Sequence, residues 1–237
     1  MKWYFFRHKE GCNDLNICQY MRLDYLIKLL ETKKYYIKRR RTFEDANESY
    51  RNNKLAFPFQ QVGNNSPQQV GSEKRIIPYS NIINCPTACW AKYEHENFLM
   101  WKSYSSEVGV CIKTTVHRFI SSLDINLGIN ENENKVLCGS MDYKQNVVPS
   151  TIEDCQLFVK DIVYENEEEY RFYFLLATDT SIKNEEKGIY VPVDINLMID
   201  EILLSPFISK ETADRIARMI KSDYDIDVKQ SSIKVKL

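Results

Sequence analysis

The sequence predicts an α+β protein, folded as a single domain with a mixed or antiparallel sheet flanked by helices. Three observations favour this class. Segments with strand-like patterns outnumber helical ones, and the two kinds do not alternate strictly along the chain. The length of 237 residues suits one domain with a sizeable core. A charged fraction of 27%, with only 7 Gly and 7 Pro, argues against disorder and fibrous repeats.

The first elements are expected to form a compact strand–helix–strand unit. Residues 17–21 (ICQYM) have the pattern of a short strand, and residues 22–30 place apolar side chains at helical spacing. Residues 34–38 (KYYIK) are expected to be a second strand. Residues 1–16 are interpreted as an N-terminal extension. The stretch 51–80, rich in Asn, Gln, Gly and Pro, is interpreted as a long loop or flap.

Strands and helices are mixed in the rest of the chain. Further strands are expected at residues 84–90, 109–115, 135–143, 170–177, 188–193 and 232–235. Further helices are expected at residues 96–105, 116–123, 196–203 and 210–222. The last of these helices has the clearest amphipathic pattern, with an inward face formed by Ala213, Ile216, Ala217 and Ile220.

Several function classes are excluded or disfavoured by missing features. No run of 18 apolar residues exists and the opening MKWYFFRHKEGC turns charged at once, so neither a membrane span nor a signal peptide is expected. Seven cysteines, an odd number at irregular spacing, indicate reduced thiols and a cytoplasmic location. Cys85 and Cys89 near His95 suggest zinc, but a second matching pair is absent, which favours structural thiols. The sequence has no G-x-G-x-x-G, P-loop, G-x-S-x-G or H-E-x-x-H motif.

Positive charge is concentrated near the start of the chain. Residues 1–60 carry 13 Lys and Arg against 7 Asp and Glu, and the densest group is Lys33, Lys34, Lys38, Arg39, Arg40 and Arg41. Such a cluster can hold the phosphates of a nucleotide or a nucleic acid. The alternative is a solvated strand edge that discourages pairing with other chains. Because neighbouring strand residues point to opposite faces, some of these cations are expected to point inward.

An acidic run before a late strand is the densest candidate for chemistry. The run is YENEEEYR, residues 164–171. If extended structure begins by residue 167, then Glu167, Glu169 and Arg171 share one face of the strand. Two such carboxylates raise each other's pKa while Arg171 counters the rise, which leaves one acid ionised and its partner able to exchange a proton. The alternative is an acidic loop with Arg171 as a salt-bridge partner.

Two further groups are weaker candidates. Trp90, Tyr93, Trp101 and Tyr104 can form an aromatic wall for a planar ring, although core packing is favoured for Trp101. Asp45 and Glu48 follow the basic segment, where such residues normally cap a turn. Together with Glu167 and Glu169, these two acids are the candidate ligands of a magnesium site in a nuclease or hydrolase.

Five segments in order resemble the bacterial family known as domain of unknown function 2971. They run from about residue 17 to 235 and read QYMRLDYLIKLLETKKYYIKRRRTFEDANES, CWAKYEHENFLMWKSYSSEVGVCIKTT, SMDY, LFVKDIVYENEEEYRFYF and VPVDINLMIDEILLSPF. The sequence departs from the family pattern at Gln19, where a basic residue is usual, and at Asp45-Ala46, where the family has Asp-Pro.

The strand–helix–strand opening, the aromatic middle and the E-x-E before a late strand also resemble the ADP-ribosyltransferase fold. This resemblance implies a split sheet and NAD as substrate. It implies Glu169 as the catalytic carboxylate, with Arg171 beside it and Glu167 orienting the acceptor. The implied NAD contacts are Tyr20, Arg39, Trp101, Ser103 and Tyr104.

The function implied by the resemblance is that of a bacterial toxin or phage-defence effector. It would transfer ADP-ribose to a nucleic acid or protein, and an antitoxin or another defence-system protein would be its partner. Two alternatives stay open at this point. One is a non-catalytic nucleic-acid-binding or interaction module, and the other is the metal-dependent nuclease or hydrolase.

Overall fold

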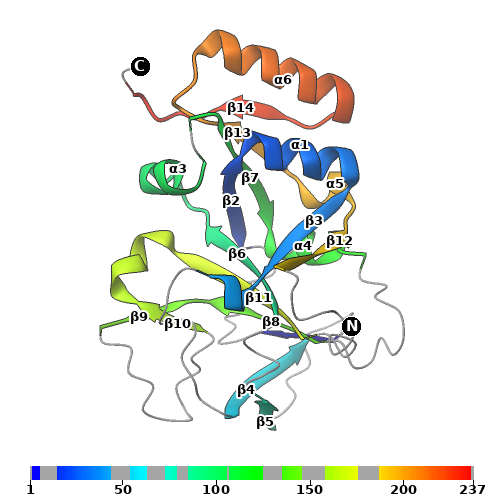
Figure 1. Cartoon of the computed structure of the whole chain (residues 1–237), viewed down its shortest axis with the longest axis vertical. Coiled ribbons are helices and arrows are strands. Elements are labelled where there is room, and N and C mark those ends of the chain that lie inside the picture. Colours follow the sequence, from blue (N-terminus) through cyan, green and yellow to red (C-terminus); the bar gives the residue numbers. More distant parts are fainter. Residues whose placement is uncertain are drawn as a thin grey trace. The chain divides into compact units, whose positions relative to one another are not determined.

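The protein has an α+β fold with a mostly antiparallel open sheet flanked by helices (Figure 1), which confirms the predicted class. The computed structural model describes residues 2–5, 15–43, 54–62, 73–78, 85–105, 107–124, 135–145, 158–175 and 187–235, with the backbone alone at 2–5, 41, 54–62, 73–78 and 135. Among these residues, no helix combines the length and apolar character that crossing a membrane requires.

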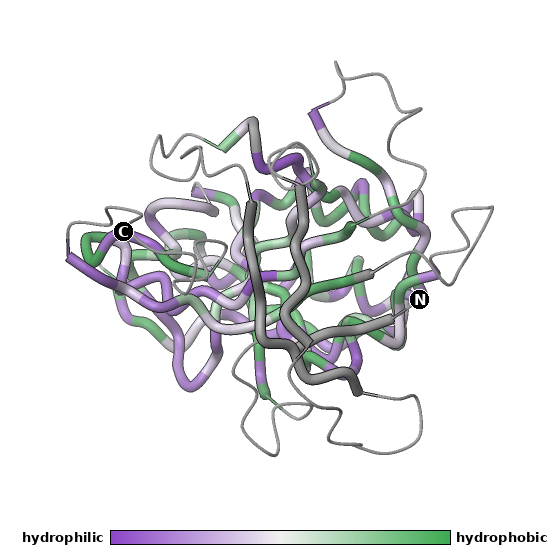
Figure 2. The backbone as a smooth tube through the Cα atoms, turned by 90° about the horizontal axis from the view of Figure 1, so that it is seen from below, coloured by the Kyte–Doolittle hydropathy of each residue, from purple (hydrophilic) through white to green (hydrophobic). Residues whose placement is uncertain are grey.

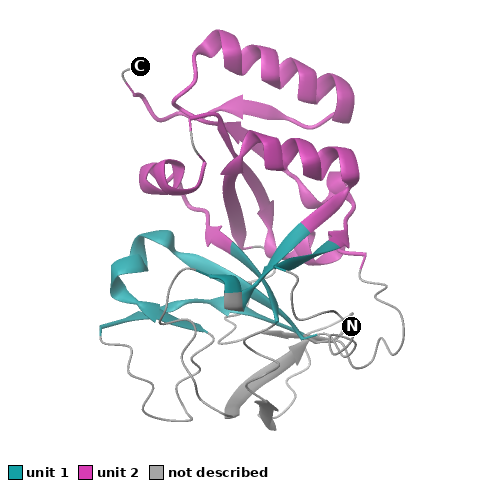
Figure 3. Ribbon diagram, in the orientation of Figure 1, with its two compact units in different colours: residues 1–10, 36–89, 125–190 teal, residues 11–35, 90–124, 191–237 magenta. Residues whose placement is uncertain are grey.

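The chain divides into two compact units, each assembled from three separate stretches (Figure 3). Unit 1 contains Met1–Glu10, Tyr36–Cys89 and Ile125–Tyr190. Unit 2 contains Gly11–Tyr35, Trp90–Asp124 and Val191–Leu237. The prediction of a single domain stays a prediction.

Unit 2 is built on four neighbouring strands in the order β14–β13–β7–β2. They are β14 (Val228–Gln230), β13 (Glu201–Leu204), β7 (Gly109–Thr115) and β2 (Asn16–Arg22). The β2–β7 and β7–β13 pairs are antiparallel, whereas β13 and β14 are parallel. Tyr20 lies opposite Cys111 in the β2–β7 pair, so the two side chains share one face of the sheet.

Most of the described helices of unit 2 begin at a residue whose side chain caps the first turn. The described helices are α1 (Leu23–Thr32), α3 (Phe98–Tyr104), α4 (Val116–Ser122), α5 (Ile195–Met198) and α6 (Lys210–Tyr224). Side-chain oxygens of Asn97, Thr115, Asp194 and Ser209 accept hydrogen bonds from backbone N–H groups in the first turns of α3, α4, α5 and α6. Hydrophobic and hydrophilic residues are interspersed along the described backbone (Figure 2).

Strand β2 is covered on both faces, and Ile17, Cys18 and Tyr20 at its centre are buried. On one face, Cys18 and Tyr20 pack with Trp101 of α3 in a core cluster. On the other face, Gln19 accepts a hydrogen bond from the Tyr35 hydroxyl at 3.0 Å, and the Tyr35 ring contacts Phe119 of α4. Alternating side chains of one strand therefore contribute to two separate layers of packing.

Unit 1 contains the other strands, in the order β6–β11–β8–β1–β4–β5. They are β6 (Pro86–Lys92, of which Pro86–Cys89 lie in this unit), β11 (Glu169–Leu175), β8 (Lys135–Ser140), β1 (Lys2–Phe5), β4 (Lys54–Val62) and β5 (Glu73–Pro78). Strand β3 (Lys34–Arg39, of which residues 36–39 lie in this unit) pairs with β6 through Lys38 and Arg39. It also pairs with β12 (Gly188–Pro192, of which residues 188–190 lie in this unit). A separate parallel pair is formed by β9 (Asp142–Lys144) and β10 (Val159–Asp161).

Gly188 allows β12 to approach β3 closely. A Cβ atom at this position would lie 2.5 Å from the Ile37 carbonyl oxygen and 2.6 Å from the Tyr36 ring. Any larger residue would therefore push the two strands apart.

Two segments that were expected outside the sheet contain strands. Residues 51–80, interpreted as a long loop or flap, contain β4 and β5, which pair with each other antiparallel. Residues 1–16, interpreted as an extension, contain β1, which pairs with β8 and β4. In both segments, turn-forming or charged neighbours obscured a short run of aromatic and apolar residues with good strand propensity.

Three other expectations differ from the structure, two of them near the C-terminus. The helix expected over 196–203 ends at Met198, and Glu201–Leu204 form strand β13 instead. The strand expected over 232–235 is absent from the described residues, because the last strand is Val228–Gln230. The expected strand 135–143 also divides at Met141 into β8 and β9.

Residues 231–235, hereafter the C-terminal segment, are held in place by hydrogen bonds from Ser231 and Ser232 to Glu96. The backbone N–H and the hydroxyl of Ser232 each donate to Glu96 Oε1 at 2.8 Å. The hydroxyl of Ser231 and the indole N–H of Trp101 donate to Glu96 Oε2, the latter at 3.2 Å. Partial burial would raise the pKa of Glu96, but these hydrogen bonds outweigh it and lower the pKa below its usual 4.5.

Glu96→Gln is expected to loosen the C-terminal segment. The amide group cannot accept all four hydrogen bonds, because one of its two polar atoms is a donor. Losing a hydrogen bond to a charged acceptor costs about 1.5–3 kcal/mol, so the Ser232 amide should exchange with deuterium at least about tenfold faster. Hydrogen exchange followed by mass spectrometry measures this, with Glu94→Gln, an exposed neighbour, as the control. Unchanged exchange at Ser232 would contradict the assignment.

Candidate functional site

The acidic run predicted to carry chemistry lies in unit 1, at the start of β11. A 3-10 helix, η5 (Ile162–Glu167), precedes the strand, and the Asp161 carboxylate accepts from the Val163 N–H at its beginning. Glu168 then adopts a left-handed conformation with φ 44°, and its N–H donates to the Glu165 carbonyl. This tight turn separates Glu167 on η5 from Glu169 on β11.

The prediction that Glu167 and Glu169 share a strand face was therefore wrong in its geometry. Extended structure begins at Glu169, two residues later than the prediction assumed. The two carboxylates nevertheless lie close together, because both bind Lys160 of β10. The Lys160 Nζ atom lies 2.6 Å from Glu167 Oε2 and 3.3 Å from Glu169 Oε2.

Arg171 completes a network of two acids and two bases, hereafter the ion-pair network. Its Nη2 donates to Glu169 Oε2 at 2.8 Å and its Nε donates to Glu169 Oε1, a two-point contact. Its Nη1 donates to the Tyr173 hydroxyl at 3.1 Å. Glu169 is only 4% exposed and the Glu167 side chain is 16% exposed, so Glu167 is the more accessible acid.

Aromatic rings and a thiol enclose the network. The Phe43 ring lies 5.7 Å from the Arg171 guanidinium, and the Tyr164 ring lies 4.5 Å from Lys160 Nζ. The backbone N–H of Glu169 donates to the Tyr143 hydroxyl oxygen at 2.7 Å, and the Cys89 side chain hydrogen-bonds to the Glu169 carboxylate. Few water molecules can approach a carboxylate surrounded in this way, which strengthens its interactions with the two cations.

The network keeps Glu169 charged. Burial alone would raise the pKa of Glu169, but the charge and hydrogen bonds of Arg171, together with Lys160, outweigh it and lower the pKa to about 2. Burial would lower the pKa of Lys160, but Glu169 and Glu167 raise it above its usual value of 10.5. Burial also raises the pKa of Tyr143, which stays protonated at neutral pH. Glu169 can therefore supply a fixed negative charge, but its pKa is too low for proton transfer near pH 7.

Lys160 of the ion-pair network and Tyr143 beside it are residues that the sequence did not indicate. Lys160 lies between Val159 and Asp161 in the segment LFVKDIVY, nine residues before Glu169. The one available signal was a single cation in a mostly apolar segment just before an acidic run. A buried Lys requires a counter-charge, so that combination can point to an ion pair.

The residues expected to contact NAD are distributed over both units. Arg39 lies in unit 1 and is buried, whereas Tyr20, Trp101, Ser103 and Tyr104 lie in unit 2.

In unit 2, Tyr20 and Trp101 are buried against each other, with ring centroids 5.0 Å apart in a T-shaped contact. The Tyr20 hydroxyl accepts from the Asn97 N–H at 3.0 Å. Ser103 and Tyr104 are exposed on α3. Trp101 packs in the core, which is the alternative that the sequence favoured for it. Of the expected NAD contacts in unit 2, Ser103 and Tyr104 are the accessible ones.

The expectation that some cations of the basic cluster point inward is confirmed, but strand alternation does not extend through it. Arg39 and Arg40 are adjacent and both buried, because β3 ends at Arg39 and a 3-10 helix, η2 (Arg40–Thr42), follows. Lys33, Lys34 and Lys38 are exposed, whereas Arg39 and Arg40 are buried. The backbone N–H groups of the two arginines donate to the Lys187 and Cys85 carbonyls. The side chain of Arg41 lies outside the described residues.

The described part of the chain contains no group of three His, Cys, Asp or Glu side chains arranged to hold a metal ion. Asp45 and Glu48, two of the four acids in the magnesium hypothesis, lie outside the described residues. Cys85 is buried with its sulfur 3.8 Å from the Thr87 hydroxyl, and Cys85 and Cys89 are both free thiols. Glu169 is occupied by Arg171 and Lys160, which leaves a metal ion little coordination capacity there.

No protein-family model matches this chain, and no curated protein matches it.

Proposed function

We propose that the chain is an NAD-consuming ADP-ribosyltransferase, related to the bacterial family of domain of unknown function 2971 and to the split-sheet ADP-ribosyltransferase fold. The observation that supports this proposal is the pair of acids at the end of η5 and the start of β11, of which Glu169 is held ionised by Arg171 and Lys160. A fixed carboxylate charge stabilises an oxocarbenium-like transition state, which forms as the bond between nicotinamide and ribose breaks.

The two acids have different roles in this proposal. Glu169 provides the fixed charge and also holds Lys160 and Arg171 in place. Glu167 is more accessible and orients the acceptor group that attacks the ribose carbon, on a nucleic acid or a protein. Nicotinamide leaves with the electron pair of the broken bond. An effector of this kind acts in the cytoplasm as a toxin or phage-defence protein, with a partner that restrains it.

Release of nicotinamide from NAD tests the proposal. We expect the wild-type protein, incubated with NAD labelled in the nicotinamide ring and with cell extract as acceptor, to release label. Glu167→Gln and Glu169→Gln should each lower this rate by about 10²–10³-fold, the range found when one electrostatic contact to the transition state is removed. Glu165→Gln is the matched control, because Glu165 belongs to the same 3-10 helix and is exposed.

Folding must be measured in parallel, because Glu169 is buried. Circular dichroism spectra and melting curves identify variants that have lost structure. If Glu169→Gln is unfolded, the rate of nicotinamide release by folded Glu167→Gln tests the assignment of the site. Absence of nicotinamide release by a folded wild-type protein would refute the proposal. Equal rates for wild type, Glu167→Gln and Glu169→Gln would refute the assignment of the site.

A further inference from the structure

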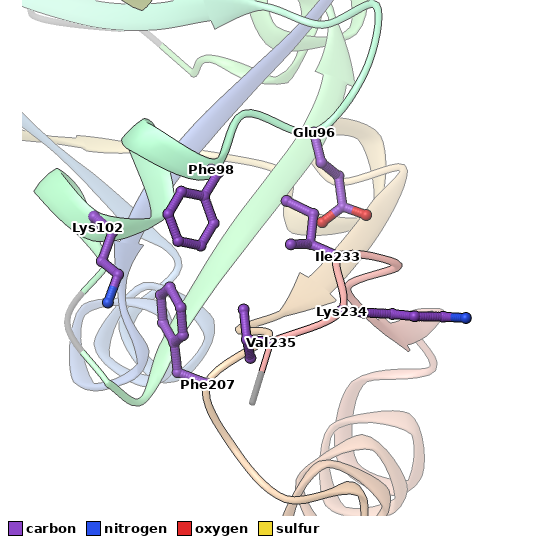
Figure 4. A pocket seen from close by; sticks show the side chains of 7 residues that line it. All are labelled: Glu96, Phe98, Lys102, Phe207, Ile233, Lys234 and Val235. Carbon is purple, nitrogen blue, oxygen red and sulfur yellow. The ribbon is translucent and has the colours of Figure 1, made fainter. Parts of the chain in front are cut away.

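A groove in unit 2, hereafter the α3 groove, combines exposed aromatic rings with positive charge (Figure 4). Its volume is about 610 Å³, within the range of ligand-binding clefts. Three separate segments line it: α3, the loop before α6, and the C-terminal segment. The lining residues are Glu96, Phe98, Lys102, Phe207, Ile233, Lys234 and Val235.

The apolar part of the α3 groove is accessible. Phe98 and Phe207 meet in a T-shaped contact with ring centroids 5.9 Å apart, yet 43% of Phe98 remains exposed. Ile233 and Val235 extend this surface from the opposite wall (Figure 4). A half-exposed aromatic pair beside aliphatic side chains is the kind of surface that anchors an apolar side chain of a ligand.

Two exposed lysines, Lys102 and Lys234, give the α3 groove a net positive charge. Lys102 Nζ lies 4.4 Å from the Phe207 ring centroid and 5.7 Å from that of Phe98. Lys102 and Lys234 make no ion pair with any residue in the described part of the chain. The Glu96 carboxylate is held by hydrogen bonds from Ser231, Ser232 and Trp101 and stays ionised, so the groove lining carries two positive charges and one negative charge.

The two lysines lie at opposite sides of the lining residues, with the aromatic pair nearer Lys102 and the Lys234 ammonium directed away from it (Figure 4). A small anion can reach one of these ammonium groups. Contact with both requires a ligand that carries separated negative charges on either side of an apolar group. An extended peptide has this arrangement, because its side chains project at regular intervals along the backbone.

We propose that the α3 groove binds a linear acidic peptide segment of a protein partner. One apolar side chain of the peptide packs on Phe98 and Phe207, and flanking Asp or Glu residues approach Lys102 and Lys234. This activity goes beyond NAD chemistry and uses none of the residues of the ion-pair network.

Fluorescence anisotropy with labelled peptides tests the proposal. The probes are fluorescein-labelled peptides with a central Phe or Leu flanked on each side by two or three acidic residues. The matched probes replace each acid by its amide. We expect saturable binding of the acidic peptides, weakened at least tenfold in the amide peptides and by increasing salt.

Variants of the protein locate the binding surface. Lys102→Glu, Lys234→Glu and Phe98→Ser should each raise the dissociation constant by about tenfold or more. Lys210→Glu is the control, because Lys210 is an exposed lysine of the same unit outside the groove, and its dissociation constant should stay unchanged. The altered side chains are exposed, so their melting temperatures should match that of the wild type.

Four results would overturn the proposal. The first is no saturable binding of any acidic peptide, and the second is an equal loss of binding in Lys210→Glu. The third is tighter binding of AMP or a single-stranded oligonucleotide with the same dependence on Lys102, which would indicate a nucleotide site. The fourth is a concentration-dependent dimer that Phe98→Ser dissociates, which would make a second copy of the chain the occupant.

Discussion

Replacing Glu169 with leucine is expected to destabilise the protein by about 3–5 kcal/mol, the typical cost of removing one partner from a buried ion pair. Leucine fills a similar volume but leaves the buried Lys160 and Arg171 without the carboxylate that binds both. Urea denaturation of wild type and variant measures the change in the free energy of unfolding. Glu165→Leu, at an exposed position, should change it by about 0.5 kcal/mol or less.

The same residue should make the stability of the wild-type protein depend on acidic pH. Glu169 has a pKa of about 2 when folded against an ordinary value of 4.5, so the folded state favours the charged carboxylate. Its contribution of about 3 kcal/mol is fully present above pH 4.5 and disappears as the pH falls toward 2.

Glu169→Gln cannot titrate and should lose this part of the slope between pH 5 and pH 2, which urea denaturation across that interval measures. An unchanged slope in Glu169→Gln would show that other carboxylates cause the acid sensitivity.

Much of the fold was predictable because many elements carry their own local signals. The prediction of a strand over residues 109–115 matches β7 exactly, since GVCIKTT combines β-branched residues with a glycine start. The α1 prediction succeeded because apolar residues at positions 23, 26, 27 and 30 follow helical spacing, and Leu26 and Leu30 of this set are buried. Such patterns depend only on neighbouring residues in the sequence, so they can be recognised without knowledge of the tertiary structure.

The errors arise where distant residues decide the structure. Glu201–Leu204 form a strand because β7 and β14 pair on either side of them, although their composition also suits a helix. Glu168 adopts a left-handed conformation, which is uncommon for a glutamate and which delays the start of β11 to Glu169. The role of Lys160 depends on the pairing of β9 with β10, which no local pattern indicates.

The candidate site was likewise predictable where the sequence pattern is local and not where tertiary packing decides. The sequence identified Glu167, Glu169 and Arg171, because an acidic run with an arginine is visible as a pattern. It could not establish which aromatic side chains are exposed, since an aromatic residue that stacks on a ligand and one that fills a core look alike in sequence. Tyr20 and Trp101 illustrate this point, because both were implied as NAD contacts and both lie in the core of unit 2.

Trp101→Ala is expected to destabilise the protein by about 3–5 kcal/mol, the range found when a buried tryptophan is truncated. Trp101 is 0% exposed, contacts Tyr20 edge to face and donates its indole N–H to Glu96. Truncation removes the largest side chain of this core cluster and one of the hydrogen bonds that fasten the C-terminal segment through Glu96. Thermal and urea denaturation measure the loss.

Trp101→Phe separates the two contributions of the side chain. Phenylalanine keeps most of the apolar contact with Tyr20 and Cys111 but cannot donate to Glu96, so we expect a smaller loss of about 1–3 kcal/mol. A tryptophan whose purpose is to stack on a ligand would behave differently, because its removal would weaken ligand binding and leave the free energy of unfolding nearly unchanged. Wild-type stability of Trp101→Ala would contradict the assignment of Trp101 to the core of unit 2.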